Sequence, residues 1–537
     1  MYTLPTSLGN EGDNYSMKEQ RTFLPEIGII YLAVPAVLFT FGWFEWWAAL
    51  GIWSLILYGF GRRVSQNEYV RGKYARKDWE IVLPCLTIFV LYLFFAGLTG
   101  NWHQQPDYYV RNDIFYSLAF EKWPLVTDDG RLFIYYFQSY LPAALLGKLC
   151  GWSAIQWLFY LWLVVGAFLL VLVAYRKLGK MALFLFVFYM VQRGLDGISS
   201  GLILHFLDGV PCSEAFLFQE HALDPFVYVS SITVLKNFPH AAVPVLLAFA
   251  LLLDKKTAQQ YGYFIGVLVV MYSPMTSIVF LPCLAYLYLR SFGNSVGEVW
   301  RAVPTLLREA VHPLALGSIL AAALLWMPYY LLMEAQAVPT KDVTFQVVFR
   351  YASFVIFNAG ILTACIYAAT KDWRIILLCV LHALCLSAVF YLFDIAYKGA
   401  IVWGMFSSVL LIPALRTDRK ILKYIIGLYV LSQCVITLAL VPSLFVAFAV
   451  AFFVWLILHG YVRYAALAFS GVCMILLCSA IVKPTLFHGP MAKLKGEEAR
   501  YSTVIGINQP EANSGMRWWY RFFPREEELP VWFKRSE

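Results

Sequence analysis

The chain has 537 residues, of which 61% are hydrophobic, 18% aromatic and only 14% charged. A soluble domain carries about a quarter of its residues as charged ones, so this composition excludes a soluble globular protein. The formal net charge of +8 calls for no nucleic acid partner, because the cytoplasmic loops of membrane proteins carry an excess of Lys and Arg.

Apolar segments of about 17–25 residues recur along the chain, and each is long enough to cross about 30 Å of hydrocarbon as a helix. The sequence therefore predicts an all-α integral membrane protein with about 13–15 transmembrane helices, whose extracytoplasmic loops carry short amphipathic or interfacial helices. Two short apolar pieces flank Pro274. This pair fits either two short helices or one re-entrant hairpin, whose backbone must be covered by protein or line a cavity.

The distribution of basic residues predicts the topology. Residues 61–77 (GRRVSQNEYVRGKYARK) contain six Lys or Arg against one Glu and are assigned to the cytoplasm. Residues 1–22 are predicted to form a cytoplasmic tail, 23–483 the membrane domain and 484–537 an extracytoplasmic tail. With this threading the other cytoplasmic segments are 175–180, 254–256, 290–308 and 416–420, and the extracytoplasmic ones are 101–151, 193–237, 334–347 and 394–400.

The first outer loop opens with NWHQQPDYYVRND (101–113), which combines two carboxylates, an arginine and a histidine with aromatic rings. Asp107 lies a few residues beyond a helix end, among tyrosines and next to Pro106. A partly desolvated carboxylate in that setting has the raised basicity of a general base. Asp113 is the second candidate, and an interfacial belt of solvated charges is the alternative interpretation. The substrate-binding candidates of this loop are His103, Tyr108 and Arg111.

Two further pieces of this loop are predicted to lie against the bilayer. Ile114, Phe115, Leu118 and Ala119 follow the spacing i, i+1, i+4, i+5, which is typical of a short amphipathic helix on a membrane surface. The stretch FIYYFQSYLPAALLGKL (133–149) is predicted to be a second membrane-hugging segment, broken before its proline.

The second outer segment brings Lys236 and His240, four positions apart, to the mouth of the next membrane helix. Two cations on one helix face suit a phosphate or pyrophosphate headgroup, and interfacial anchors are the alternative. Arg193 begins the same segment and is a further candidate for substrate binding. Lys398 is another, because it lies between two apolar helices where an idle charge is costly. The basic, aromatic stretch MRWWYRFF (516–523) is expected to fold back on the bilayer or on the active cavity.

Several motifs between residues 100 and 290 resemble the GT-C superfamily of integral-membrane glycosyltransferases, and more closely a group of its bacterial members. They are PDYYVRND…KWPL, YYFQSYLPAALLGKLCGW, YVSSITVLKNFPHAAVP and YSPMTSIVFLP, with a weaker echo in NQPEANSGMRWWYRFF. The resemblance implies a catalytic acidic residue in the first outer loop, Asp107 or Asp113, and a polyprenyl-phosphate-sugar donor. The chain departs from the family at AYKGAIVWGM, which has Lys398 and no arginine.

The leading interpretation is a glycosyltransferase that moves a sugar from this donor to a glycan, lipid or protein acceptor at the outer face of the bacterial plasma membrane, with membrane lipids as further partners. A general base, cations for the leaving phosphate and an aromatic wall are what such a transfer needs. A transporter or lipid flippase is one alternative, although no inverted repeat is evident, and an O-antigen-type polymerase or ligase is another. No CxxC or HExxH spacing indicates a structural zinc site. A divalent Mg²⁺ or Mn²⁺ ion between Asp107 and Asp113 requires the loop to bring both carboxylates together.

Overall fold

The structure, a computed structural model, describes most of the membrane region of the chain. The described residues are 22–70, 75–99, 107–126, 132–192, 205, 209, 235, 238–272, 274–293, 295–331, 345–393, 424, 427–429, 431, 442–459 and 531–534. Within them the regular elements are all helical, and two isolated β-bridges join Phe44 to Phe533 and Val126 to Leu132. The predicted all-α membrane class is confirmed.

Helix starts follow the positions of prolines. Several helices carry proline in the first turn, where the missing N–H would have no partner within the helix. The α-helices are α1 (Leu24–Trp43), α2 (Trp46–Ser65), α3 (Arg76–Phe95), α4 (Asp107–Phe120), α5 (Leu141–Cys150), α6 (Trp152–Leu178), α7 (Met181–Val191), α11 (Pro239–Leu252), α12 (Lys255–Tyr272), α13 (Pro274–Phe292), α14 (Val296–Arg301), α15 (Val303–Ala310), α16 (Pro313–Ala321), α17 (Met327–Leu331), α18 (Phe345–Val355), α19 (Ile361–Thr370), α20 (Trp373–Phe393) and α23 (Pro442–Leu458), together with the 3-10 turn η1 (Gln138–Tyr140) and the π-helical stretches η2 (Ala322–Trp326) and η3 (Ile356–Gly360).

Four helical stretches in the described part of the chain are long and apolar enough to cross a membrane: 24–43, 77–95, 154–178 and 313–330. Four shorter apolar helices are also present in the described residues. The total of about 13–15 crossings, expected from the lengths of the apolar segments, stays a prediction. Around Pro274 the chain forms two helices, α12 and α13, of 18 and 19 residues that pack along each other. Each is about 27 Å long, close to the thickness of the hydrocarbon layer.

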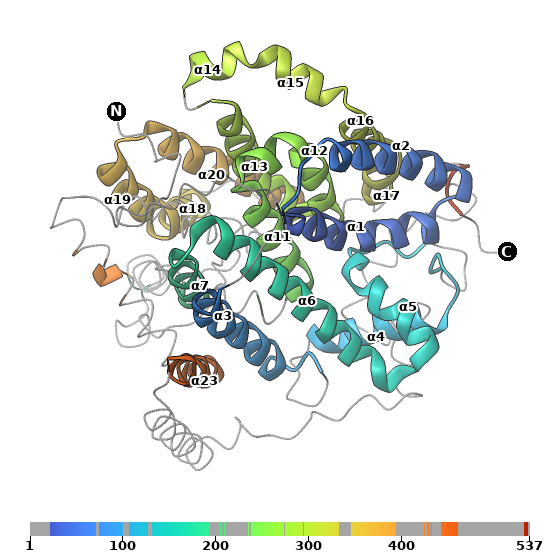
Figure 1. Ribbon diagram of the computed structural model, residues 1–537, viewed down its shortest axis with the longest axis horizontal. Coiled ribbons are helices and arrows are strands. Elements are labelled where there is room, and N and C mark those ends of the chain that lie inside the picture. The colour runs from blue at the N-terminus through green and yellow to red at the C-terminus, as the bar shows by residue number, and fades with distance from the viewer. Residues whose placement is uncertain are drawn as a thin grey trace.

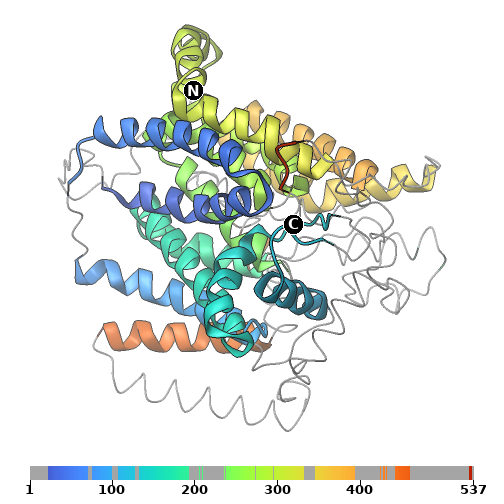
Figure 2. The same cartoon turned by 90° about the vertical axis from the view of Figure 1, so that its right-hand side faces the viewer.

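The core of the bundle is built around α11, which packs against α1, α6 and α12 (Figure 1). Every residue of α11 is buried, as expected for a helix that is apolar on all sides. The helices α3 and α23 lie side by side in both views (Figures 1 and 2). An ion pair at 3.2 Å between His459 and Glu80 joins them at one end.

The helix predicted after Arg111 is present as α4, but its apolar stripe packs on the protein and does not face lipid. Ile114, Phe115 and Leu118 are at most 1% exposed, and the ring of Phe115 lies 4.7 Å from that of Tyr140. The predicted membrane-hugging stretch 133–149 is likewise buried through η1 and the first turn of α5. These segments have apolar partners within the bundle, so they bury their stripes there.

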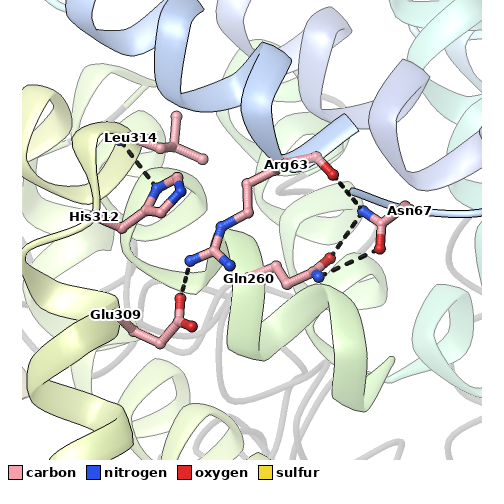
Figure 3. Close-up of polar contacts among 6 residues, drawn as sticks. All are labelled: Arg63, Asn67, Gln260, Glu309, His312 and Leu314. Carbon is pink, nitrogen blue, oxygen red and sulfur yellow. Dashed lines mark hydrogen bonds and ion pairs between the residues drawn. The ribbon is translucent and has the colours of Figure 1, made fainter. Parts of the chain in front are cut away.

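At one end of the bundle, polar contacts join residues in or close to the segments that the sequence assigns to the cytoplasm. The guanidinium of Arg63 pairs with Glu309, and the side-chain amide of Asn67 donates to Gln260 Oε1 at 3.2 Å (Figure 3). Lys177 pairs with Asp254 at 3.1 Å. The grouping agrees with the positive-inside prediction, which put residues 61–77, 175–180, 254–256 and 290–308 on one side.

The other end of α1 meets the first outer loop and the C-terminal tail. The backbone N–H of Glu45 donates to the Trp532 carbonyl at 2.8 Å, and that of Lys534 donates to the Trp43 carbonyl at 3.0 Å. The rings of Trp43 and Trp123 lie 5.5 Å apart. Residues 531–534 therefore lie at the end of the bundle opposite to Arg63, and the extracytoplasmic location of the tail stays a prediction.

Candidate functional site

A cavity of about 810 Å³ opens at this tail-bearing end of the bundle. Four segments that are far apart in the sequence form it: the second half of α1, the link after α4, the end of α5 and the C-terminal tail. It is called here the lysine pocket. The residues that line it are Val37, Leu38, Phe41, Gly42, Glu45, Lys122, Trp123, Pro124, Lys148 and Lys534.

The floor of the lysine pocket is the indole of Trp123, held in place from two sides. Its Nε1 donates to the Leu118 carbonyl at the end of α4 at 2.8 Å. On the other side a Cβ on Gly42 would lie only 3.0 Å from Trp123 Cε3. Glycine at position 42 thus lets the indole approach the backbone of α1. The apolar wall continues along α1 through Leu38 and Phe41, the latter 40% exposed.

The ammonium group of Lys148 is oriented by two contacts. It donates to the Glu121 carbonyl at 2.7 Å and lies 5.1 Å from the centroid of the Trp123 ring. Burial lowers the pKa of Lys148, and the nearby Glu121 carboxylate acts in the opposite direction. A partly desolvated ammonium that is fixed over an aromatic face is a stronger electrostatic partner for an anion than a fully hydrated one.

The charges of the lysine pocket favour an anionic ligand with an apolar body. Lys122, Lys148 and Lys534 supply three positive charges and Glu45 one negative charge, a formal sum of +2. Ammonium groups hold phosphate as point charges, while the α1 wall offers hydrocarbon side chains to an acyl or prenyl chain. An apolar lining with a few placed polar groups is typical of ligand pockets, and this one suits an amphipathic anion.

The residue His240 lies at the start of α11, at the predicted mouth of this helix, but it is in a packed core, which corrects the prediction that it is open to a phosphate headgroup. It is 3% exposed, and its Nδ1 is 3.1 Å from the hydroxyl of Tyr140. The ring of Tyr136 stacks on it at 5.8 Å, and Ser139 Oγ donates to its carbonyl at 2.5 Å. These contacts join η1 to the start of α11, so His240 positions the outer loop.

The other predicted residues of the first loop lie on or before α4. Arg111 is 5% exposed, and its neighbour Asn112 accepts a hydrogen bond from Gln156 Nε2 at 3.1 Å. Asp107 opens α4 and Asp113 lies at its middle. The side chains of Asp107, Tyr108 and Asp113 and the whole of His103, Arg193, Lys236 and Lys398 lie outside the described residues.

The two candidate acids differ in their distance from the lysine pocket. With a helical rise of 1.5 Å per residue, the Asp107 backbone is about 20 Å from Phe120 at the end of α4, and the Asp113 backbone is about 10 Å from it. Lys122 follows two residues later and lines the pocket. Along α4, Asp113 therefore lies nearer than Asp107 to the lysine pocket.

No metal-binding group is evident in the described residues, where no cluster of three or more His, Cys, Asp or Glu side chains could hold an ion. The predicted Mg²⁺ or Mn²⁺ site rests on the side chains of Asp107 and Asp113, so it stays a prediction.

The fold and this site define an all-α membrane protein with a cationic, partly apolar pocket at one end of its helix bundle. Comparison with protein-family models, with curated proteins and with solved structures gave no match.

The pocket residues were not predicted as a group from the sequence. Lys122 and Trp123 belong to the KWPL motif, and Lys148 belongs to the LLGKLCGW stretch that ends α5. Both motifs are among those that resemble glycosyltransferases. The sequence could have indicated Lys122, because it is a cationic residue next to a tryptophan in a predicted outer loop. It could not have indicated Lys534, because this residue reaches the pocket only through the folding of the tail.

Proposed function

We propose that the chain is a glycosyltransferase of the plasma membrane that takes a polyprenyl-phosphate-sugar donor in the lysine pocket. The observation that supports this is the pairing of three ammonium groups with an apolar wall on α1. The phosphate would bind to Lys122, Lys148 and Lys534, and the prenyl chain would lie along Val37, Leu38 and Phe41.

The proposed reaction is an inverting transfer. The acceptor hydroxyl attacks the anomeric carbon, and the bond from that carbon to the phosphate oxygen breaks. A carboxylate of the first outer loop, Asp107 or Asp113, takes the hydroxyl proton. The lysines stabilise the negative charge that develops on the leaving phosphate. The acceptor is a glycan, lipid or protein at the outer face of a bacterial membrane.

The lysine pocket is tested by replacing its cations one at a time with glutamine. A lost charge-assisted hydrogen bond costs about 1.5–3 kcal/mol, so Lys148→Gln should weaken binding of a polyprenyl phosphate about tenfold to a hundredfold. Affinity is measured by titrating the detergent-solubilised protein and detecting bound lipid by native mass spectrometry. The matched control is Lys256→Gln, which removes an exposed lysine from the opposite end of the bundle.

Two results would overturn the proposal. Unchanged affinity in Lys122→Gln, Lys148→Gln and Lys534→Gln would remove the pocket as the donor site. Binding of the lipid phosphate with intact pocket lysines, but translocation across vesicles and no transfer of sugar to any acceptor offered, would favour a flippase.

A further inference from the structure

The linker between α13 and α16 forms two short helices that project from the edge of the bundle. In Figure 2, where α1 and α2 run across the view, α14 and α15 are seen nearly end-on at the top. None of the residues of these two helices is buried. They begin at a capped turn, where the Glu298 N–H donates to Ser295 Oγ at 3.3 Å.

The apolar residues of this linker are both exposed and aligned. Val296 and Trp300 lie on α14, Val303 and Leu307 lie on α15, and Val311 follows the end of α15. Within each helix the spacing of four positions puts the two residues on one face. Four of these five residues, all but Val303, are between 64% and 76% exposed to solvent. The linker therefore has a hydrophobic face that no other described part of the protein covers.

The linker carries four charged residues. Glu309 is turned toward the bundle, where it pairs with Arg63 (Figure 3). Glu298, Arg301 and Arg308 are exposed. Because Glu309 is paired with Arg63, the exposed charges of the linker are two arginines against one glutamate.

We propose that residues 296–311 are an in-plane membrane anchor that binds anionic phospholipid headgroups. The linker connects two bundle helices, α13 and the span that begins at Pro313, so it starts and ends at the lipid–water boundary. Its apolar face enters the acyl region, and Arg301 and Arg308 bind headgroup phosphates. The leaflet is the one at the end with the basic loops, opposite to the lysine pocket.

The test uses the full-length protein in nanodiscs of phosphatidylcholine alone or with 30% phosphatidylglycerol. Amide hydrogen exchange of residues 296–311 reports how often the linker leaves the surface. Two arginines together strengthen binding to an anionic membrane about thirtyfold (about 2 kcal/mol). Amide exchange of the linker should therefore be slower by up to that factor in the anionic discs at low salt. The difference should shrink as salt is added.

The variant Arg301→Gln/Arg308→Gln should lose this difference between the two kinds of disc. Lys255→Gln/Lys256→Gln is the matched control, because it removes two exposed cations at the same end of the bundle and leaves the linker intact. Trp300→Glu should raise exchange in both discs. Equal exchange of the parent protein in the two discs, or equal behaviour of the two double variants, would overturn the proposal. Fast, unprotected exchange in both discs would instead indicate a face for a soluble protein.

Discussion

The imidazole of His312 caps the helix α16, because the Leu314 N–H donates to its Nδ1 at 3.3 Å. This contact requires a neutral ring with an unprotonated Nδ1. Burial, together with the positive charges of Arg63 and Arg62, lowers the pKa of His312 to about 4. The nearby Glu309 is paired with Arg63 (Figure 3), and burial raises its pKa against the pull of that guanidinium.

A pH-dependent stability follows from this cap. The folded pKa of about 4 is below the unfolded value of about 6.5. Above pH 6.5 the stabilisation is fully present, and it is lost as the pH falls toward 4, because the unfolded state binds the proton first. His312→Asn keeps a capping acceptor without the titration. Its melting temperature in detergent should therefore fall less than that of the parent protein between pH 7 and 4.5, and parallel curves would contradict this assignment.

The two candidate bases, Asp107 and Asp113, are separated by their places on α4. General-base assistance is worth about 10²–10⁴-fold, so asparagine at the base should lower the transfer rate by that factor while binding of polyprenyl phosphate stays nearly unchanged. The sequence favours Asp107, whereas proximity to the lysine pocket favours Asp113. Single-turnover transfer by Asp107→Asn and Asp113→Asn decides between them. Parental rates in both variants would remove the first outer loop from the chemistry.

Among the elements, α2 and α16 approach each other closely at glycine residues. Gly59 and Gly317 face the partner helix: a Cβ on Gly59 would lie 2.2 Å from the Leu314 nitrogen, and one on Gly317 would lie 2.9 Å from Ile56 Cγ1. The contact at Gly59 is with backbone, which cannot move away as a side chain can. Small residues allow such approaches between membrane helices.

Gly59→Ala should therefore destabilise the protein. Overpacking typically costs about 1–3 kcal/mol, and more where backbone must shift. Gly61→Ala, two positions away, meets no atom within 4 Å; it should be neutral or stabilising by up to about 1 kcal/mol, because alanine favours helix over glycine. Thermal unfolding in detergent compares the two. Equal melting temperatures would show that the helices separate to admit the methyl group.

The elements also show what a single sequence can predict. The spacing of apolar residues predicted the helix α4, because this spacing depends on neighbouring residues. It could not show that Phe115 packs on Tyr140 and Phe159, at ring distances of 4.7 and 5.0 Å. Such long-range contacts decide whether an apolar stripe faces lipid or protein. The burial of His240 could not be predicted for the same reason, because its partners Tyr136 and Tyr140 are about a hundred positions earlier in the sequence.

For the whole molecule, two groups of contacts mark the opposite ends of one bundle. α1 has 20 residues and α6 has 27, which makes them about 30 and 40 Å long, enough to separate the groups by a membrane.

At the basic end Asp254 is paired with Lys177. Burial raises the pKa of Asp254, but the lysine and the hydrogen bonds from Thr257 outweigh it, so the pKa is lowered overall. Charge counting predicted this end because basic loops are read from local composition, whereas the lysine pocket combines residues from both ends of the chain.

The topology of the whole molecule is testable through its native Cys150, which is free and exposed at the end of α5 near the lysine pocket. If that end is extracytoplasmic, a membrane-impermeant maleimide should label Cys150 in intact cells, and Cys150→Ser should remove that part of the signal. A cysteine introduced by Lys256→Cys in the Cys150→Ser background should react only after the cells are permeabilised, because position 256 is exposed at the basic end. The reverse labelling pattern would show that the topology is inverted. The lysine pocket would then open to the cytoplasm, and residues 296–311 would lie on the outer leaflet. Labelling at both positions in intact cells would contradict a bundle whose two ends are separated by the membrane.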